Sequence, residues 1–303
     1  MSTEVLGLGA VAVDEILCVD QYPPADAKAQ VRQRERRCGG LAATALVAAA
    51  RLGCRCAYAG VLGRDDASAF AAACMEAEGI DLSQAQRRDE ARVIRSAIVA
   101  DLGRGTRNIF FDLNGVVGAG DDWPPEAVIR SAQVLLVDFI GMEGMIRAAR
   151  IAQSAGVPVV ADLEDASAPG FAELLGLVDH LVLSHEFALG YTGEGEPARA
   201  AQKLWRDGRA LVAITCGAAG YWVCTGGTPV HCPAFAVETV DTTGCGDVFH
   251  GAYAAGLARG LALGDSLRLA SAAAALKASR RGGQEGIPTR AEVEHFFSER
   301  SSV

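Results

Sequence analysis

The sequence predicts an α/β protein in which helices cover both faces of a mostly parallel sheet. Short runs rich in β-branched residues alternate along the chain with alanine-rich stretches of helical length. Several of these stretches end at a glycine, as at Gly53, Gly79 and Gly260. Hydrophobic types make up 50% of the 303 residues, which is enough for one large core with a small subdomain. We therefore expect a single three-layer α/β/α domain over residues 1–303.

The expected elements follow from these patterns in chain order. Strands are predicted at residues 4–8, 11–19, 56–61, 134–138, 157–161, 181–183 and 210–215. Helices are predicted at residues 41–52, 67–78, 143–155, 198–206 and 248–259.

Two segments, residues 13–37 and 91–113, interrupt the alternation of strands and helices. Turn residues punctuate both of them, with Pro23 and Pro24 in the first and the run from Gly103 to Thr106 in the second. Extended segments that leave a parallel sheet and return to it favour a small β-sheet. We expect these two segments to form a β lid that is inserted in the core.

Charge and composition exclude several classes of partner. The net charge is -9 and the pI is about 5.1, which disfavours nucleic acid and anionic membranes as partners. We expect neither a signal peptide nor a spanning segment, because acids interrupt the apolar run after Met1 and no run is long enough. The nine cysteines are odd in number and form no CxxC pair. They indicate free thiols in a cytoplasmic protein.

A glycine pattern near the amino terminus suggests a dinucleotide site. The run from Gly7 to Ala12 fits GxGxxA after a strand. That motif requires a helix directly after it, whereas here β-branched residues and two prolines follow. The sequence thus disfavours a dinucleotide oxidoreductase. The glycines are interpreted as close packing of a strand, with Asp14 as a carboxylate that projects toward a ligand.

The run VDTTGCGDVFHG, from Val240 to Gly251, has the composition of an anion site. Gly244, Cys245 and Gly246 come just before a helix that is expected to begin near Asp247. The first amides of a helix lack internal acceptors and carry partial positive charge, and glycines allow a ligand to approach closely. Asp247 could be a simple N-cap, worth about 1 kcal/mol. The whole run favours phosphoryl transfer instead, with the amides holding the transferred group and Asp247 accepting a hydroxyl proton.

The run from Asp241 to Gly251 resembles the second signature of the ribokinase-like (PfkB) family of carbohydrate and nucleoside kinases, DTxGAGDxFxxG. Cys245 replaces the usual alanine of that signature. The first signature has its counterpart in the run from Gly39 to Thr44 and the GVLGRD that follows at residues 60–65. The resemblance extends over essentially the whole chain. It implies a ribokinase-like fold and an ATP-dependent sugar kinase.

The resemblance also implies roles for individual residues. Asp14, Gly39, Gly40 and Thr44 would hold the hydroxyls of the sugar, although Thr44 stands where the family usually has asparagine. The residues expected around ATP are Thr215, Gly217, Gly220, Thr242 and Gly283.

Two metal ions are expected from the same resemblance. Potassium is expected near Asp241 and Thr243. Mg²⁺ would accompany ATP, but the run from Ser184 to Ala188 lacks the glutamate of the family's NxxE pattern. That role would pass to Glu186 or to water. Asp162 and Glu164 are further magnesium candidates, because they follow a strand.

Within the family, the chain most resembles the ketohexokinase-like and sulfofructose-kinase-like branches. A ketose or a sugar acid is therefore the expected substrate. Lys28 is either a contact for an anionic group or a solvated lysine on a lid strand. The resemblance implies a homodimer that forms through paired lids. A nucleoside kinase and a non-catalytic sugar or nucleotide sensor on the same fold remain alternatives.

Overall fold

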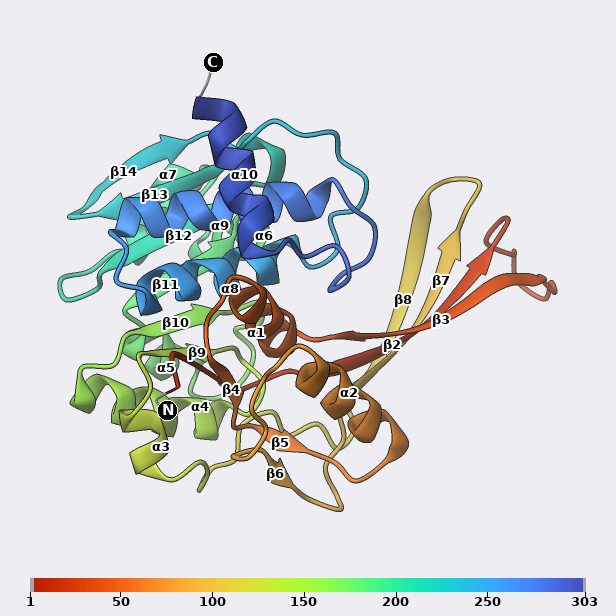
Figure 1. Ribbon diagram of the computed structural model, residues 1–303, viewed down its shortest axis with the longest axis horizontal. Helices are drawn as coiled ribbons and strands as arrows, with labels where there is room; N and C mark the ends of the chain where they lie inside the picture. The colour runs from red at the N-terminus through yellow and green to blue at the C-terminus, as the bar shows by residue number, and fades with distance from the viewer. Residues whose placement is uncertain (1–2, 302–303) are drawn as a thin grey trace.

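The computed structural model describes residues 3–301, and an eight-stranded sheet lies at the centre of its layered body (Figure 1). The strand order is β14-β13-β12-β11-β10-β9-β1-β4. The first six strands of this sheet in the sequence are parallel, and β13 and β14 add an antiparallel hairpin at one edge. The strands are β1 (Val5–Gly7), β4 (Cys56–Tyr58), β9 (Val134–Val137), β10 (Val159–Asp162), β11 (His180–Ser184), β12 (Leu211–Thr215), β13 (Tyr221–Thr225) and β14 (Thr228–Cys232).

Helices cover both faces of this sheet, as predicted for a three-layer fold. One face is covered by α1 (Leu41–Arg51), α2 (Asp66–Ala77), α8 (Cys245–Ala258), α9 (Leu263–Ala278) and α10 (Arg290–Ser301). The other is covered by α3 (Glu126–Arg130), α4 (Met142–Ala155), α5 (Phe171–Leu177), α6 (His185–Thr192) and α7 (Pro197–Leu204). A short 3₁₀ turn, η1 (Gly217–Ala219), joins β12 to β13.

The alternation of side chains along the strands divides the core in two. Val160 and Val182 point into the cluster that includes α1, α8 and α9, whereas Ala161 and Leu183 point into the cluster with α4 to α7. Strands that are buried on both faces consist of nearly continuous apolar runs. For this reason their positions could be predicted from the sequence.

A second sheet extends from the layered body like an arm (Figure 1). Its order is β3-β2-β7-β8, and we call it the small sheet. Its strands are β2 (Ala12–Val19), β3 (Val31–Gly39), β7 (Ile94–Asp101) and β8 (Thr106–Asp112). The strands β2 and β7 are parallel, while β3 and β8 pair antiparallel at the two edges.

Some details differ from the sequence prediction. The strand expected at 56–61 ends at Tyr58, and the chain then continues as β5 (Val61–Leu62), which pairs with β6 (Gln86–Arg87) in a separate sheet. Gly60 separates the two pieces, at a place where an added Cβ would lie 2.6 Å from the Gly118 carbonyl oxygen. The helix expected to begin near Asp247 begins at Cys245, because Gly244 takes a positive φ of 75° and caps it.

Candidate active site

The loop from Asp241 to Gly244 is held in place by the Asp241 side chain. Its Oδ1 accepts a hydrogen bond from the Thr243 amide at 2.9 Å, and its Oδ2 accepts one from the Gly282 amide at 3.0 Å. These hydrogen bonds keep the pKa of Asp241 below its usual value against the opposing effect of burial. A charged Asp241 thus fixes the loop that leads into α8.

The start of α8 offers free amides, but not the three that were predicted. The Cys245 amide donates to the Thr242 carbonyl at 3.2 Å, so it is already engaged in a turn. Among residues 3–301, no acceptor faces the amides of Gly244, Gly246 and Asp247. Asp247 therefore takes the place of Cys245 in the expected anion cradle.

Cys245 lies beside these amides as a neutral group. Burial raises the pKa of its thiol to about 11, and the sulfur lies 3.7 Å from the Ala274 carbonyl oxygen. A protonated thiol is a weak nucleophile, so this residue contributes its small size rather than reactivity.

Asp247 lies in the first turn of α8, next to other acidic side chains. Burial raises its pKa well above the usual value, and the charges of Asp162, Glu164 and Asp138 raise it further. Asp138 follows β9 and Asp162 ends β10, so both come from the carboxyl edge of the parallel sheet. A raised pKa suits a carboxylate that has to accept a proton near neutral pH.

His250 connects α8 to the sheet beneath it. The His250 side chain is buried, and its Nε2 lies 2.9 Å from the Val182 carbonyl oxygen. Its Nδ1 lies 2.8 Å from the Gly246 carbonyl oxygen and 3.1 Å from Oδ2 of Asp162. These contacts position the first turn of α8 over the ends of β10 and β11.

Asp14 lies at the base of the small sheet, opposite two polar residues. It pairs with Arg37 of β3 on one side and with Ser96 of β7 on the other. Burial raises the pKa of Asp14, and the Ser96 hydroxyl acts against this effect. A Cβ at Gly39 would lie 3.1 Å from its Oδ2, which shows how closely the first signature approaches it.

The two signatures meet at Thr44. A Cβ at Gly244 would lie 3.5 Å from Cγ2 of Thr44 and 3.6 Å from the Gly283 carbonyl oxygen. Thr44 itself is 3% exposed, and its hydroxyl accepts a hydrogen bond from Nε2 of Gln284 at 3.2 Å. Thr44 therefore supports the loops from below, and its hydroxyl is already engaged by protein.

Comparison with known proteins agrees with this geometry. The model of the pfkB family carbohydrate kinases matches residues 2–290. The chain belongs to this family. It is therefore an ATP-dependent sugar or nucleoside kinase.

Several relatives match this kinase over nearly its full length. It is 29% identical to a ribokinase of Haemophilus influenzae, over 96% of this chain and 97% of the relative. It is 32% identical to an ATP-dependent ribose-1-phosphate kinase of Halopiger xanaduensis, over 98% of each chain. The crystal structure of a ribokinase from Thermotoga maritima matches with a TM-score of 0.86 and 25% identity, over 98% of this chain and 99% of that one. These matches confirm the ribokinase-like fold.

The residues predicted around ATP belong to the end of β12, to the turn η1 and to the loops near the start of α8. Thr215 ends β12, and η1 with Gly217 follows it. Tyr221, directly after Gly220, packs its ring on Phe249 of α8 at a centroid distance of 5.6 Å. Thr242 and Gly283 belong to the loops near the start of α8, where a Cβ at Gly283 would lie 3.7 Å from Cγ2 of Thr243.

The structure provides few side chains for a metal ion in this kinase. Within residues 3–301, no group of three or more His, Cys, Asp or Glu side chains is arranged so that it could hold a metal ion. Glu186 is exposed in the first turn of α6, whereas Ala188 is fully buried. Such a donor set fits a Mg²⁺ ion that keeps most of its water and is bound mainly by nucleotide phosphates.

Of the remaining predicted residues, Lys28 lies far from Asp14, and Asp241 lies beside a lysine that was not predicted. Lys28 lies beyond Val31, in the connection between β2 and β3 at the far end of the small sheet. The five residue steps from Asp14 to Val19 along β2 span about 17 Å, so Lys28 is not brought to Asp14. Lys277 was not predicted as a site residue from the sequence, but its Nζ donates a hydrogen bond to the Asp241 carbonyl at 2.8 Å.

The two arginines near Asp14, Arg37 and Arg107, were not predicted as site residues from the sequence. Arg37 and Arg107 both lower the pKa of Asp14 by their charges, against the larger effect of burial. Within residues 3–301, the Arg107 side chain makes no hydrogen bond or ion pair. The period-two pattern of the small sheet could have identified both, because the register places them on the face of Asp14.

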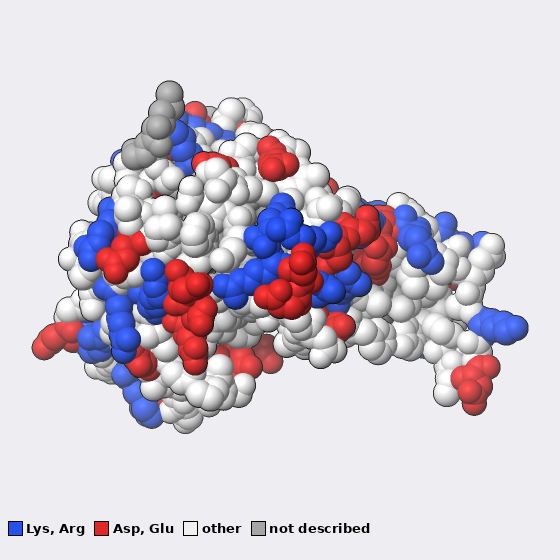
Figure 2. All heavy atoms as spheres, turned by 90° about the horizontal axis from the view of Figure 1, so that it is seen from below, with Lys and Arg blue, Asp and Glu red and all other residues white. Residues whose placement is uncertain are grey.

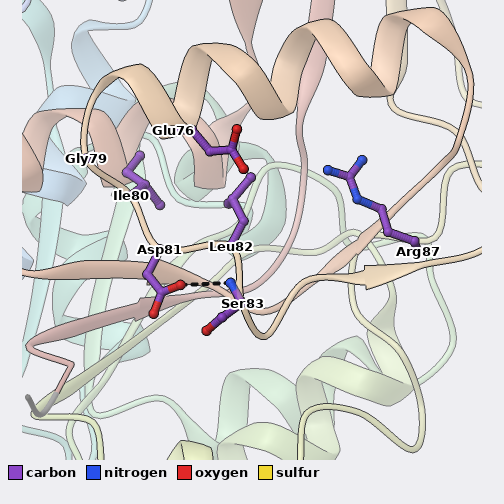
Figure 3. A pocket seen from close by; sticks show the side chains of 7 residues that line it. All are labelled: Glu76, Gly79, Ile80, Asp81, Leu82, Ser83 and Arg87. Atoms are coloured by element: carbon purple, nitrogen blue, oxygen red, sulfur yellow. Dashed lines mark hydrogen bonds between the residues drawn. The ribbon is translucent and has the colours of Figure 1, made fainter.

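Other surface features lie away from this site. The hollow in Figure 3 lies beneath α2 and is lined by Glu76, Asp81 and Arg87, among others, none of which is a predicted site residue. Figure 2 shows acidic and basic side chains interspersed beside the small sheet, in agreement with the ion pairs of Arg64 with Asp89 and Arg36 with Asp66. No helix within residues 3–301 is long and apolar enough to span a membrane.

Proposed function

We propose that this kinase transfers the γ-phosphoryl group of ATP to a primary hydroxyl of a small sugar, with Asp247 as the general base. The observation that carries the proposal is the position of Asp247 in the first turn of α8. Its carboxylate belongs to the same turn as the free amides of Gly244 and Gly246. Thr44 and Gly39 connect this turn to Asp14. Base, anion cradle and a carboxylate for sugar hydroxyls thus belong to one site.

Each residue has a defined task in this reaction. Asp14 accepts hydrogen bonds from sugar hydroxyls and orients the acceptor. Asp247 accepts the proton of the attacking hydroxyl, and the free amides stabilise the charge that develops on the transferred group. ATP is the phosphoryl donor, and Mg²⁺ would neutralise the charge of its phosphates, with Glu186 as a candidate contact through water. Movement of the small sheet toward the body would exclude water from the reacting groups.

Replacing Asp247 by asparagine tests the proposal. We expect kcat to fall by about 10²–10⁴-fold, because a general base is lost, while ATP binds as before. ADP release on a panel of ketoses, aldoses, sugar acids and nucleosides measures the rate, and calorimetry measures ATP binding. Asp265→Asn is a matched control, since Asp265 also follows a glycine in the first turn of a helix, α9, and is exposed. Full turnover by Asp247→Asn would overturn the assignment.

We further propose that the sugar carries an anionic group, as a sugar acid or a phosphorylated sugar does. The support is the unpaired guanidinium of Arg107, which acts electrostatically on both Asp14 and Lys277. The name of the relative from Halopiger xanaduensis, a ribose-1-phosphate kinase, describes such a substrate. Ketoses with an anionic substituent belong to this class. The proposed relation to the ketohexokinase-like and sulfofructose-kinase-like branches stays a prediction.

The same panel separates the alternatives. A nucleoside kinase would release ADP with nucleosides and not with sugars. A sensor would bind sugar or nucleotide without releasing ADP, and an intact Asp247 beside free amides argues against it.

We also propose that the kinase acts as a homodimer in the cytoplasm, with the small sheets in contact. Every residue of β8 is exposed, and Phe111 and Ile109 share the face of Asp14. Exposed apolar side chains that cluster on an edge strand favour burial against another surface.

A further inference from the structure

A lysine is buried behind the loop that leads into α8. The Lys277 side chain is 0% exposed, although lysine almost never lies fully inside a protein without a partner. Its Nζ donates to the Asp241 carbonyl at 2.8 Å and lies 4.0 Å from Oδ1 of the same residue. Lysines in the last turn of a helix usually reach into solvent, whereas this one, in the last turn of α9, points into the protein.

The position of Lys277 is the place where the resemblance implies a potassium ion. A monovalent cation near Asp241 and Thr243 would need oxygen atoms that are free to coordinate it. Here the Asp241 carbonyl is bound by Nζ, Oδ1 accepts from the Thr243 amide and Oδ2 accepts from the Gly282 amide. An ammonium this close would also repel a second cation. The residues present therefore do not fit a bound potassium ion.

We propose that the Lys277 ammonium replaces the monovalent cation, as a fixed positive charge behind the loop from Asp241 to Gly244. It holds the Asp241 carbonyl and supports the Asp241 carboxylate, which in turn holds the Thr243 and Gly282 amides. Lys277 is thus a positioning residue for the free amides of α8, and the kinase needs no potassium. This inference rests on the proposed function only where catalytic rate is measured.

Two substitutions of Lys277 should differ in their response to added monovalent cations. Lys277→Met fills the space with an uncharged side chain, so it should lower kcat by about 10-fold or more. Because no room is left for an ion, added potassium or ammonium should not restore its rate. Lys277→Ala leaves room for an ion, so its lost activity should return in part with potassium or ammonium chloride. The rate is ADP release with the panel sugar that gives the fastest turnover. Choline chloride keeps the ionic strength constant. Lys203→Met, at an exposed position of α7, is the control.

Thermal unfolding without substrate provides a readout that does not depend on turnover. Potassium should raise the melting temperature of Lys277→Ala relative to choline, but not that of the wild type, Lys277→Met or Lys203→Met. If no sugar of the panel is phosphorylated, the comparison of melting temperatures still tests the role of Lys277. That result would count only against the proposed function.

Three results would overturn the inference. The first is a wild-type enzyme whose rate or melting temperature rises with potassium at constant ionic strength. The second is full kcat in Lys277→Met. The third is a Lys277→Ala protein that folds, with a melting temperature indifferent to potassium and ammonium.

Discussion

A Cβ at Gly251 would lie 2.0 Å from the carbonyl oxygen of Ala45. Gly251 closes the second signature on α8, and Ala45 follows the first signature on α1. The two helices therefore pack backbone to backbone, which only glycine permits at this point. Their packing sets the position of Asp247 relative to Gly39 and Thr44, so one contact links the fold to the site.

Gly251→Ala should force α8 away from α1. Overpacking of this kind costs about 1–3 kcal/mol, so the melting temperature should fall. The displaced Asp247 should also lower kcat. Gly264→Ala on α9 is the control, because nothing lies within 4 Å of its Cβ position, and it should leave stability equal or slightly higher. Unchanged stability and kcat in Gly251→Ala would contradict the close packing.

Glu164→Gln tests the electrostatic setting of the base. The charge of Glu164 raises the pKa of Asp247, as do burial and the charges of Asp162 and Asp138, while His250 lowers it. The base acts when deprotonated, so kcat/KM should fall at low pH through this raised pKa. Removing the Glu164 charge should move that acidic limb to lower pH, measured as kcat/KM against pH. A shift of the acidic limb to higher pH in Glu164→Gln would contradict the proposed effect of Glu164 on the pKa of Asp247.

The buried side chain of His180 should make the stability of the protein depend on pH. It is 5% exposed, its Nδ1 lies 2.7 Å from the Tyr253 hydroxyl, and burial lowers its pKa from 6.5 to about 4. Between these values the unfolded chain binds more protons, so the free energy of unfolding falls as pH falls from about 6.5 to about 4, by roughly 3 kcal/mol.

Substitution of His180 checks this dependence. In His180→Gln the decline between neutral and acidic pH should be shallower, measured by urea unfolding at several pH values. His295→Gln, at an exposed position of α10, should keep the wild-type slope. Identical slopes in His180→Gln and wild type would show that another group dominates.

The sequence predicted most of the fold because its strongest signals are local. Buried parallel strands are continuous apolar runs, and alanine-rich helices end at glycines, so both can be located without knowledge of distant contacts. The hairpin of β13 and β14 and the helices α9 and α10 were not assigned. The strand β14 is largely exposed, so it lacks the continuous apolar run of the buried strands.

Only the part of the site that consists of contiguous sequence could be predicted. The two signatures identified Asp247, Asp14 and the loop at Gly244, since they are contiguous in the sequence. Arg107 and Lys277 were missed because tertiary structure alone brings them to the site. Arg107 reaches it through the register of β8 and β7, and Lys277 through the docking of α9 behind Asp241.

Arg107→Met tests the proposed anionic substrate. A hydrogen bond to a charged group contributes about 1.5–3 kcal/mol, which corresponds to about 10–100-fold in kcat/KM. We expect that loss for sugar acids or sugar phosphates, and little change for neutral sugars. Arg104→Met, in the exposed turn between β7 and β8, is the matched control. Equal losses for charged and neutral sugars would contradict an anion contact.

Phe111 tests the proposed dimer. It is 66% exposed on the face of the small sheet that carries Asp14, and Ile109, at 49%, lies beside it on that face. If two small sheets pack through these side chains, Phe111→Ser should weaken the dimer by at least about 10-fold, because aromatic anchors dominate such interfaces. Light scattering over a dilution series measures the mass, with Val230→Ser as the control, since Val230 is 56% exposed on β14. A wild-type monomer at every concentration, or a dimer indifferent to Phe111→Ser, would contradict the proposal.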